Sequence, residues 1–524
     1  MSQMLKSSGA MAAATLTSRV LGMVREMVYA AFMGSGMVAS AFVLAFQVPN
    51  LFRRLLGEGA LTAAFIPIFK QKEVQEGETE MWRAANAVIS GLTVAAATVT
   101  VLAVLGISLA LAAGQFTDET RLMLRLLRLM FPYMLLVCLA AVFIGMANAR
   151  GHFFVPALGA VVLNLVMIAS VLLLAPRMGR TLEEQVFALA IGVLVAGLAQ
   201  AFFQLPSLSR EGYRYEWVSP WRNPTVREVV QKMLPGSIGV AAFQINVLVT
   251  SWFSFWFGKS IVADFNYSVR LMELPQGLFG ISLATYLLPT LSGLAGQKKF
   301  PEFRRTLGQG LGHLALANLL AAAIALALAE PIVRLLFERG KFDAHTTYRV
   351  ALALKCLAPG LLMFSMNNIL ARAFYALSDV KTPMKISIVC LALNLVFSLW
   401  LIRSYREMGL GVANTLSASF NMLLLLYALR RKLARLGLTE LGRSLLVLVP
   451  SAALAGLAAA ALAAFWGRHL GHASLPLKLG QVFVPAAGAC LLYWLLALAF
   501  KVPAAREMTD LFLRHLAKTP APAA

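Results

Sequence analysis

The sequence predicts an all-α integral membrane protein with about 14 transmembrane helices. Of its 524 residues, 59% are hydrophobic and 13% are charged, whereas a soluble domain averages roughly 45–50% apolar and about 25% charged residues. Apolar stretches of about 20 residues, the length that crosses the hydrocarbon core of a bilayer, recur along the chain. No long polar stretch separates them, so the sequence leaves no room for a sizeable soluble domain.

The predicted spans are bounded by charged residues or by Gly and Pro. In order they are 11–33, 37–69, 84–113, 122–147, 154–176, 184–208, 227–257, 261–295, 307–329, 346–376, 381–402, 408–430, 443–466 and 479–500. Spans 37–69 and 261–295 are too long for one straight crossing, and each contains an internal proline, Pro49 or Pro275. We expect both helices to be bent or interrupted. A bilayer tolerates freed backbone groups only against protein or water, so these breaks are a first indication of a transport path.

The distribution of charge predicts the orientation. The first span carries Arg19, Arg25 and Glu26, so it lacks the clean apolar core of a cleaved signal peptide and is predicted to be a retained helix. Lys and Arg are more frequent in the loops on the side of the termini, which the positive-inside rule places in the cytoplasm. The net charge of +22 is scattered over short loops, so it does not indicate nucleic-acid binding.

An internal repeat divides the chain. Pro132 and Pro156 are 24 residues apart, as are Pro359 and Pro383, and each proline opens a predicted helix. The same offset of about 225 residues relates the stretch after Gly34 to the stretch after Gly258. Chance similarity of apolar sequence is the alternative explanation. We expect a parallel repeat: two pseudo-repeated six-helix lobes, 1–220 and 221–440, around a central cavity, followed by two additional transmembrane helices and a cytoplasmic tail, 441–524.

Ionisable residues inside the predicted spans are candidates for a binding site. The first span contains Arg19, Arg25 and Glu26, the bent second span contains Arg53, Arg54 and Glu58, and the bent eighth contains Arg270 and Glu273. An arginine at mid-bilayer costs about 2.5–3.5 kcal/mol on insertion scales, so several together need water, partners or a polar ligand. A purely structural explanation pairs Arg54 with Glu58 and Arg270 with Glu273, one helical turn apart, and lets the first-span arginines reach the lipid headgroups.

The acids are too few to neutralise all of these arginines, and the repeat makes the two bent helices equivalent. Arginine binds phosphate oxygens with two parallel hydrogen bonds and stays protonated, so the pattern favours an anionic, phosphorylated substrate. Nothing indicates catalysis: the chain has no phosphate-binding GxxxxGK[ST] motif and no recognisable nucleophile motif. The six histidines lack zinc-site spacing, and the four cysteines are interpreted as small buried apolar residues. No metal or cofactor is predicted.

Several sequence runs resemble the MurJ/MviN-type lipid II flippases, which belong to the multidrug/oligosaccharidyl-lipid/polysaccharide exporter superfamily. These runs are TSRVLGMVRE at 17–26, VPNLFRRLLGEGAL at 48–61, AFIP at 64–67, RLMELPQG at 270–277, LLPTLS at 287–292, AFYA at 373–376 and KTP at 381–383. The resemblance extends over the full length, including the two C-terminal helices. The PNLFRR and RLMELPQG runs are its most specific parts.

The resemblance implies a flippase that moves lipid II, the undecaprenyl-diphosphate-linked peptidoglycan precursor, from the cytoplasmic to the periplasmic leaflet by alternating access. It also implies that Arg19, Arg25, Arg53 and Arg270 line the cavity and hold the diphosphate. The last two helices would form a groove for the isoprenoid tail. We interpret Glu26, Arg54, Glu58, Glu273, Pro49 and Pro275 as supporting or gating residues. The chain is expected in the bacterial inner membrane, as a monomer among membrane lipids, with the cell-wall synthesis machinery as a possible partner.

The sequence departs from the family pattern at Ser40, Gln47 and Val269, where many relatives carry an acid, a base and an acid. Some relatives bind sodium among polar residues of the second lobe. Here Gln244, Asn246, Asn394 and Asn414 are polar, but ordinary hydrogen bonds between helices explain them at least as well, so sodium or proton coupling is left open. The alternatives are a flippase for another polyprenyl-diphosphate-linked glycan, a cation-coupled antiporter of the same fold, and a non-transporting membrane scaffold.

Overall fold

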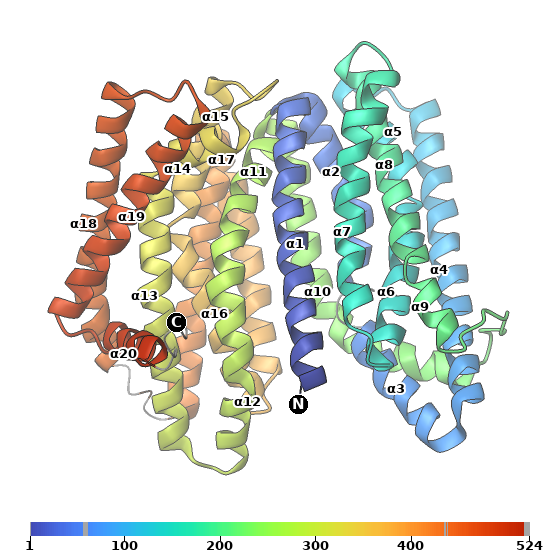
Figure 1. Ribbon diagram of the computed structural model, residues 1–524. Helices are drawn as coiled ribbons and strands as arrows, with labels where there is room; N and C mark the ends of the chain where they lie inside the picture. Colours follow the sequence, from blue (N-terminus) through green and yellow to red (C-terminus); the bar gives the residue numbers. More distant parts are fainter. Residues whose placement is uncertain (1, 56–60, 434–435, 437–438, 518–524) are drawn as a thin grey trace, which may run out of the picture. The chain divides into compact units, whose positions relative to one another are not determined.

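The computed structural model describes residues 2–55, 61–433, 436 and 439–517, and the regular structure of these residues is entirely helical. The predicted all-α class is therefore confirmed. The chain forms two compact units. Unit 1 comprises Met1–Ala263 with Arg339–Phe342, and unit 2 comprises Asp264–Glu338 with Asp343–Ala524. Within each unit the long helices run side by side (Figure 1).

The helices follow the predicted spans closely. Those that begin before residue 260 are α1 (Ser2–Met33), α2 (Met37–Phe52), α3 (Leu61–Glu76), α4 (Glu78–Ala113), α5 (Asp118–Met130), α6 (Tyr133–Ala149), α7 (Phe154–Ala169), η2 (Ser170–Leu174), η3 (Ala175–Arg177), α8 (Leu182–Phe202), α9 (Leu205–Arg210) and α10 (Pro224–Phe257). The later ones are α11 (Ile261–Pro275), η4 (Gln276–Ile281), α12 (Ser282–Gly296), α13 (Phe300–Ala327), α14 (Ala329–Phe337), α15 (Ala344–Leu357), α16 (Gly360–Ala376), α17 (Lys381–Leu433), α18 (Thr439–His469), α19 (Leu475–Ala499) and α20 (Pro503–Ala517).

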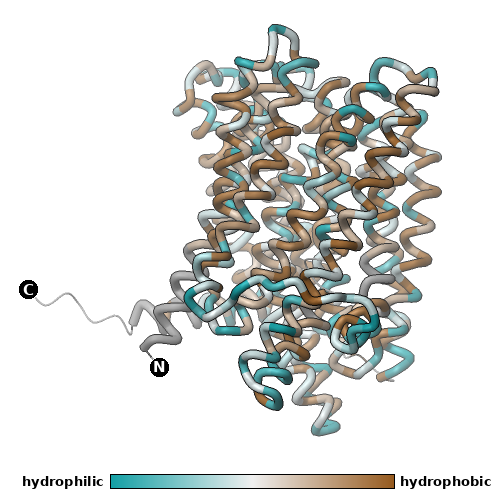
Figure 2. Tube along the Cα trace, turned by 90° about the vertical axis from the view of Figure 1, so that its right-hand side faces the viewer, coloured by the Kyte–Doolittle hydropathy of each residue, from teal (hydrophilic) through white to brown (hydrophobic). Residues whose placement is uncertain are grey.

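Eight described helices are long and apolar enough to cross a membrane, or ten if each of two bent pairs is one span. Figure 2 shows hydrophobic residues along the helices and hydrophilic residues concentrated at the turns. The α17 segment contains two of the predicted spans, because Arg406 (φ 49°, ψ −127°) separates two helices within it. The three-part division at residues 220 and 440 stays a prediction.

Both long spans are interrupted, as predicted. α2 ends at Phe52, three residues beyond the buried Pro49, and residues 53–55 are π-helical. In the second half α11 ends at Pro275, and the π-helix η4 follows it directly. Proline cannot donate the backbone hydrogen bond of a regular helix and its ring collides with the preceding turn, which explains why the interruptions lie beside these two residues.

The repeat is visible in the bent pairs. α5 and α6 meet at 40° around Pro132, and α15 and α16 meet at 46° around Pro359. The helices that open the two pairs also begin alike. The Thr117 hydroxyl accepts a hydrogen bond from the Thr120 N–H, and the Asp343 carboxylate accepts one from the Thr346 N–H. Such caps satisfy N–H groups that a helix leaves unpaired at its start.

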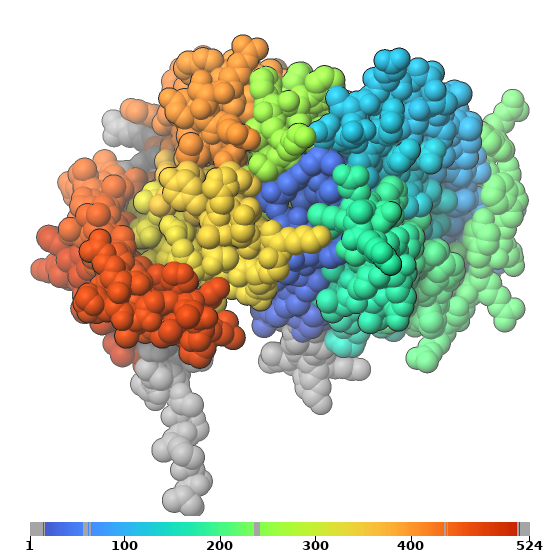
Figure 3. All heavy atoms as spheres, turned by 90° about the horizontal axis from the view of Figure 1, so that it is seen from above, coloured from blue at the N-terminus to red at the C-terminus, as the bar shows by residue number. Residues whose placement is uncertain are grey.

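The last two long helices, α18 and α19, pack against α13 within unit 2 through small residues and one buried hydroxyl. Ala455 and Ala459 of α18 are fully buried, and a Cβ at Gly456 would lie 3.4 Å from the Cβ of Ala323 in α13. The buried Tyr493 hydroxyl of α19 donates to the Leu316 carbonyl, 3.0 Å away. Small residues allow close approach of helices in lipid. Figure 3 shows the orange-red α18–α19 region beside the yellow α14–α15 region. Cys490 of α19 is exposed, contrary to the expectation of buried cysteines, because it lies on the outer face of this helix.

A short segment from the second half of the sequence completes unit 1. The Lys341 N–H donates to the Ala31 carbonyl, 2.9 Å away, so residues 339–342 pack against the end of α1. Two glycines make this contact possible. Gly34 and Gly340 both have positive φ, and a Cβ on either would lie within 2.4 Å of a carbonyl oxygen of the other segment. Only glycine fits at both positions.

Candidate functional site

Arg25 is held in place by a neighbouring helix. Its guanidinium donates to Asn164 Oδ1 at 3.1 Å and to Glu26 Oε1 at 2.6 Å, and it lies 5.7 Å from the centre of the Tyr29 ring. Asn164 of α7 in turn donates to the Ser18 carbonyl, 3.2 Å away. The side chain of Arg25 is 17% exposed. This guanidinium is therefore fixed between α1 and α7. The purely structural explanation required it to reach the lipid headgroups, and it does not.

Arg19, two turns earlier on α1, differs from Arg25. Its side chain is exposed, and it makes no hydrogen bond or ion pair with the described residues. Glu26 is buried, with 7% of its surface exposed. α1 therefore carries one accessible guanidinium and one that is already neutralised by a carboxylate. Because an apolar helix gains nothing by exposing a bare guanidinium to lipid, Arg19 is the candidate in α1 for direct contact with an anion.

The second predicted group lies where α2 ends. Arg53 Nε donates to Asn50 Oδ1 at 2.7 Å, one turn back, and this bond orients the guanidinium beside the π-helical residues 53–55. Arg54 is half-buried. The predicted partner Glu58 lies outside the described residues, so the Arg54–Glu58 pair stays a prediction. The structure brings Arg53 and Arg54 together at the interruption beyond Pro49.

The third predicted group lies in unit 2, on the last turns of α11. Arg270 Nη1 donates to Glu273 Oε2 at 2.8 Å, with the two side chains 30% and 46% exposed. The predicted one-turn ion pair is thus confirmed. Pro275 and η4 follow within a few residues, and η4 packs closely on α16. A Cβ on Gly280 would lie 2.6 Å from Ser365 Oγ. Arg270 is therefore positioned directly before a tightly packed break in the helix.

The departures from the family pattern have different structural surroundings. Ser40 is fully buried, and its hydroxyl accepts a hydrogen bond from the Ala263 N–H, 3.2 Å away. The acid that many relatives carry at this position could accept the same hydrogen bond. Ser40 therefore keeps the hydrogen-bond acceptor and lacks only the charge. Gln47 has a buried side-chain oxygen with no hydrogen bond to the described residues. Val269 precedes Arg270 on α11 and adds no polar group to that turn.

The polar residues considered for sodium are divided between the two units. Asn414 donates to the Leu410 carbonyl of its own helix at 2.9 Å, the ordinary helical bond that was the alternative. Gln244 is buried in unit 1, whereas Asn394 is buried in unit 2. Among the described residues no group of three or more His, Cys, Asp or Glu side chains is arranged to hold a metal ion.

Sequence reasoning missed the partners of the arginines. Asn164 and Tyr29 fix Arg25, but Asn164 lies 139 residues away inside an apolar span. A single asparagine in such a span was the one available signal. The sequence also gave no indication of two charged clusters at helix ends, around Arg150 in unit 1 and around Asp379 in unit 2.

The Arg150 cluster joins three segments of unit 1. The guanidinium contacts Glu73, Glu78 at 2.8 Å and Glu211 at 3.0 Å, and its side chain is 15% exposed. His152 Nε2 lies 2.8 Å from the second oxygen of Glu211. Hydrogen bonds from His152 and Arg150 lower the pKa of Glu211 below its ordinary value. The pKa of Glu73 is lowered as well, first by its hydrogen bond with Lys70.

The Asp379 cluster joins the turn after α16 to the end of α17. Lys432 Nζ donates to Asp379 Oδ2 at 2.7 Å, and the Thr382 N–H donates to Asp379 Oδ1 at 3.0 Å. These bonds, first that of Lys432, lower the pKa of Asp379 to about 2. The carboxylate therefore serves both as an ion-pair partner and as the cap of the helix that begins at Lys381.

Comparisons with known families and sequences give consistent matches. The family described as "Lipid II flippase MurJ" matches residues 29–481. That range includes Arg53 and Arg270 and excludes Arg19, Arg25 and α20. A "Probable lipid II flippase MurJ" from Haemophilus influenzae is 34% identical over 85% of this chain and 89% of its own length. A "Lipid II flippase MurJ" from Burkholderia cenocepacia is 35% identical over 80% of this chain and 82% of its own.

Solved structures show the same fold. "Lipid II flippase MurJ, inward closed conformation" superposes with a TM-score of 0.74 at 19% identity, over 97% of this chain and 99% of that one. A multidrug resistance MATE family transporter in an inward-facing conformation gives 0.64 at 13% identity, over 80% of this chain and 96% of that one. The family match and the relatives above 30% identity decide the assignment. This chain is a bacterial multi-pass membrane protein, a transporter and not an enzyme, and it belongs to the lipid II flippase MurJ family.

Proposed function

We propose that this protein translocates lipid II from the cytoplasmic to the periplasmic leaflet of the bacterial inner membrane by alternating access. One observation carries the proposal beyond family membership. Guanidinium groups stand at Arg19 in α1, at Arg53 where α2 ends and at Arg270 near the end of α11, and two of them adjoin helix interruptions. Such groups are costly in a membrane unless a polar ligand uses them, and a diphosphate offers oxygens that arginine binds in pairs.

The proposed roles of the residues differ. Arg19, Arg25, Arg53 and Arg270 bind the diphosphate and sugar headgroup, with Glu26, Arg54, Glu58, Glu273, Pro49 and Pro275 in supporting or gating roles. Arg270 begins paired with Glu273, whose side chain is 46% exposed. A diphosphate therefore replaces the Glu273 carboxylate as the partner of Arg270, and this carboxylate can rotate toward water. The Arg270 guanidinium thus keeps an anionic partner throughout. Arg25 meets the headgroup from a fixed position, because Asn164 holds its guanidinium and Glu26 is already paired with it.

The break at Pro275 and η4 supports a hinge role. Gly277 and Gly280 are buried, and Ser365 Oγ donates to Asn318 Oδ1 at 3.1 Å, so the break is tightly packed yet lacks regular α-helical bonding. A bend that moves relative to α16 reorients the turn that carries Arg270. Binding of the anion neutralises the arginines and so favours closure on the cytoplasmic side. Closure that proceeds equally well without the headgroup would contradict this coupling.

The remaining features of the proposal follow the repeat and the loop charges. We retain the two six-helix lobes, 1–220 and 221–440, and assign the isoprenoid tail to a groove of the C-terminal helices. α18 and α19 support this role because they expose apolar side chains, including Leu446, Leu457 and Leu491. Both termini are proposed to face the cytoplasm, and the cell-wall synthesis machinery is the proposed protein partner.

The test is a rescue assay in bacteria depleted of their own lipid II flippase, with the lipid II that reaches the periplasmic leaflet as the readout. We expect the wild type to restore export and Arg270→Ala to lower it about tenfold, the loss of one charge-assisted contact. Arg270→Lys keeps the charge but not the planar fork, and should fall between the two. Arg431→Ala, which removes an exposed arginine at the end of α17, is the matched control.

The outcomes separate substrate from mechanism. If inserted wild-type protein fails in a compatible host, the substrate is another polyprenyl-diphosphate-linked glycan. If the wild type works and Arg270→Ala, at equal membrane abundance, works equally well, the cationic-site mechanism is wrong.

A further inference from the structure

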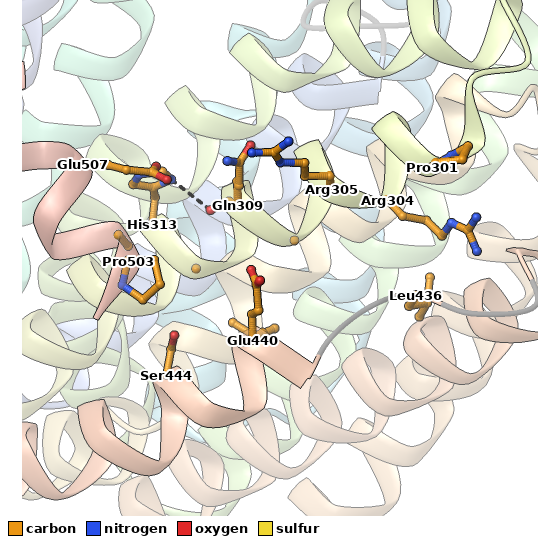
Figure 4. Close-up of a pocket in the computed structure, with 14 residues that line it drawn as sticks. Pro301, Arg304, Arg305, Gln309, His313, Leu436, Glu440, Ser444, Pro503 and Glu507 are labelled. Carbon is orange, nitrogen blue, oxygen red and sulfur yellow. Dashed lines mark hydrogen bonds and ion pairs between the residues drawn. The ribbon is translucent and has the colours of Figure 1, made fainter. Parts of the chain in front are cut away.

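A pocket of unit 2 is lined by none of the proposed substrate arginines. It has a volume of about 560 Å³ and is formed where α13, α18 and α20 begin (Figure 4). Ligand pockets in proteins have volumes of about 300–1,000 Å³. α20 closes one side of this pocket, and α20 lies beyond the residues that match the family. One wall of the pocket therefore lies outside the residues that match the family, and the rest of its lining lies within them.

The closing helix is attached firmly. Ala504 and Ala505 of α20 are buried in the core of unit 2. Glu507, one turn later, has its Oε2 atom 3.1 Å from Nε2 of His313 in α13. His313 Nδ1 lies 2.9 Å from the Gln309 carbonyl, which can only accept, so this nitrogen carries a proton. His313 and Glu507 thus satisfy each other and hold the wall of the pocket, leaving other groups to face a ligand.

Positive charge lies on the α13 side of the pocket. Arg304 is oriented by two backbone carbonyls, donating to Phe300 at 3.2 Å and to Leu433 at 3.5 Å. Arg305 is exposed and makes no hydrogen bond or ion pair with the described residues. The first turns of α13 and α18 also line the pocket, and helix starts add a partial positive charge. Figure 4 shows that Arg304 extends toward Leu436 and Arg305 toward Gln309, so Arg305 is the guanidinium suited to a phosphate group in this pocket.

Negative charge lies opposite, on α18. Glu440 points from the first turn of α18 toward α13, between Arg304 and His313 (Figure 4). It is exposed and makes no hydrogen bond or ion pair with the described residues. The pocket therefore offers one cationic group, Arg305, and one carboxylate, Glu440, that are not needed for its walls. A ligand that satisfies both carries a phosphate and a cationic hydrogen-bond donor.

We propose that this pocket binds an ethanolamine phospholipid headgroup, with the phosphodiester against Arg305 and the primary ammonium against Glu440. A membrane source fits the surroundings. α13 and α18 continue from the pocket as apolar spans, and Leu446, two residues beyond the lining Ser444, is 77% exposed. The inference does not rest on the proposed flippase activity, because it uses none of the same residues.

The test uses the full-length protein purified in detergent and titrated by native mass spectrometry with three lipids of identical acyl chains. These carry ethanolamine, choline or glycerol headgroups. We expect the ethanolamine lipid to bind most tightly, because the quaternary ammonium of choline donates no hydrogen bond to Glu440. Arg305→Gln should weaken the ethanolamine and glycerol lipids alike, each about tenfold. Glu440→Gln should weaken the ethanolamine lipid alone.

Arg443→Gln is the matched control, since Arg443 is an exposed cation on α18 that does not line the pocket. It should change nothing. Soluble glycerophosphoethanolamine distinguishes the source of the headgroup: no displacement of the lipid at equal concentration supports a membrane ligand, and full displacement overturns it. Equal binding of choline and ethanolamine lipids, or wild-type binding by Arg305→Gln, overturns the proposal. Lipid II is absent from this assay, so these failures leave the flippase proposal untouched.

Discussion

The turn after α6 and the turn after α16 occupy equivalent positions in the repeat, yet they carry opposite charge. In unit 1 the turn provides a cation, Arg150, that binds three carboxylates. In unit 2 it provides a carboxylate, Asp379, that binds one lysine and caps a helix. The repeat has therefore kept the backbone bend and the presence of an ion pair while reversing the polarity. Charge at these turns is a local solution in each unit and is not a property of the repeat.

The largest effect is expected from Arg150→Ala. This change leaves Glu73, Glu78 and Glu211 side by side without their shared cation, and it also removes the guanidinium 5.9 Å from the centre of the Trp82 ring. We expect a loss of about 2–3 kcal/mol, the cost of breaking a partly buried charged network. Thermal unfolding in detergent measures it. Arg83→Ala removes an exposed cation, 67% accessible, that pairs with Glu80, and should cost almost nothing.

A drop as small as that of Arg83→Ala would show that the three carboxylates are solvated independently. The Arg150 and Asp379 turns would then differ in the sign of their charge without differing in how the charge stabilises the fold.

A smaller effect is expected from Asp379→Ala, because only one lysine and one cap are lost. The expected cost is about 1–2 kcal/mol, combining a cap with a half-exposed ion pair. Asp379→Asn keeps an oxygen for the Thr382 N–H and should cost roughly half as much. Unfolding midpoints of the two variants measure the difference. Equal costs would mean that the ion pair with Lys432, and not the cap, holds this turn.

The smallest expected effect is the loss of stability at low pH. The pKa of Asp379 is lowered to about 2 from an ordinary value of about 3.9. Its stabilisation is therefore complete above about pH 4 and is lost as the pH falls toward 2. The lowered pKa values of Glu73 and Glu211 act in the same direction, below their ordinary value of about 4.3.

Asp379→Asn should make the stability of the protein slightly less dependent on pH in the acid range. Unfolding midpoints between pH 5 and 3 measure this change. A wild-type and a variant protein with the same acid dependence would remove Asp379 from the explanation.

The sequence was sufficient to predict the helices and their breaks, because both depend on local chemistry. Pro132, Pro275 and Pro359 remove backbone donors wherever the chain places them, and apolar length reports a span directly. Arg270 and Glu273 were paired correctly because they lie one turn apart. Asn164 could not be assigned to Arg25, nor Ser40 to the Ala263 N–H, because these contacts depend on which helices become neighbours. α20 was predicted only as a tail, since its 15 residues are too few and too polar for a span.

The segment Arg339–Phe342 has a consequence for the order of synthesis. Unit 1 needs the bond from the Lys341 N–H to the Ala31 carbonyl, but all of residues 264–338, which belong to unit 2, are made first. At roughly 5–20 residues per second, the ribosome needs several seconds to add them. Throughout that interval the end of α1 at Gly34 lacks its contact with the segment Arg339–Phe342. The packing of unit 1 at the end of α1 is therefore completed only after residues 264–338 of unit 2 have been made.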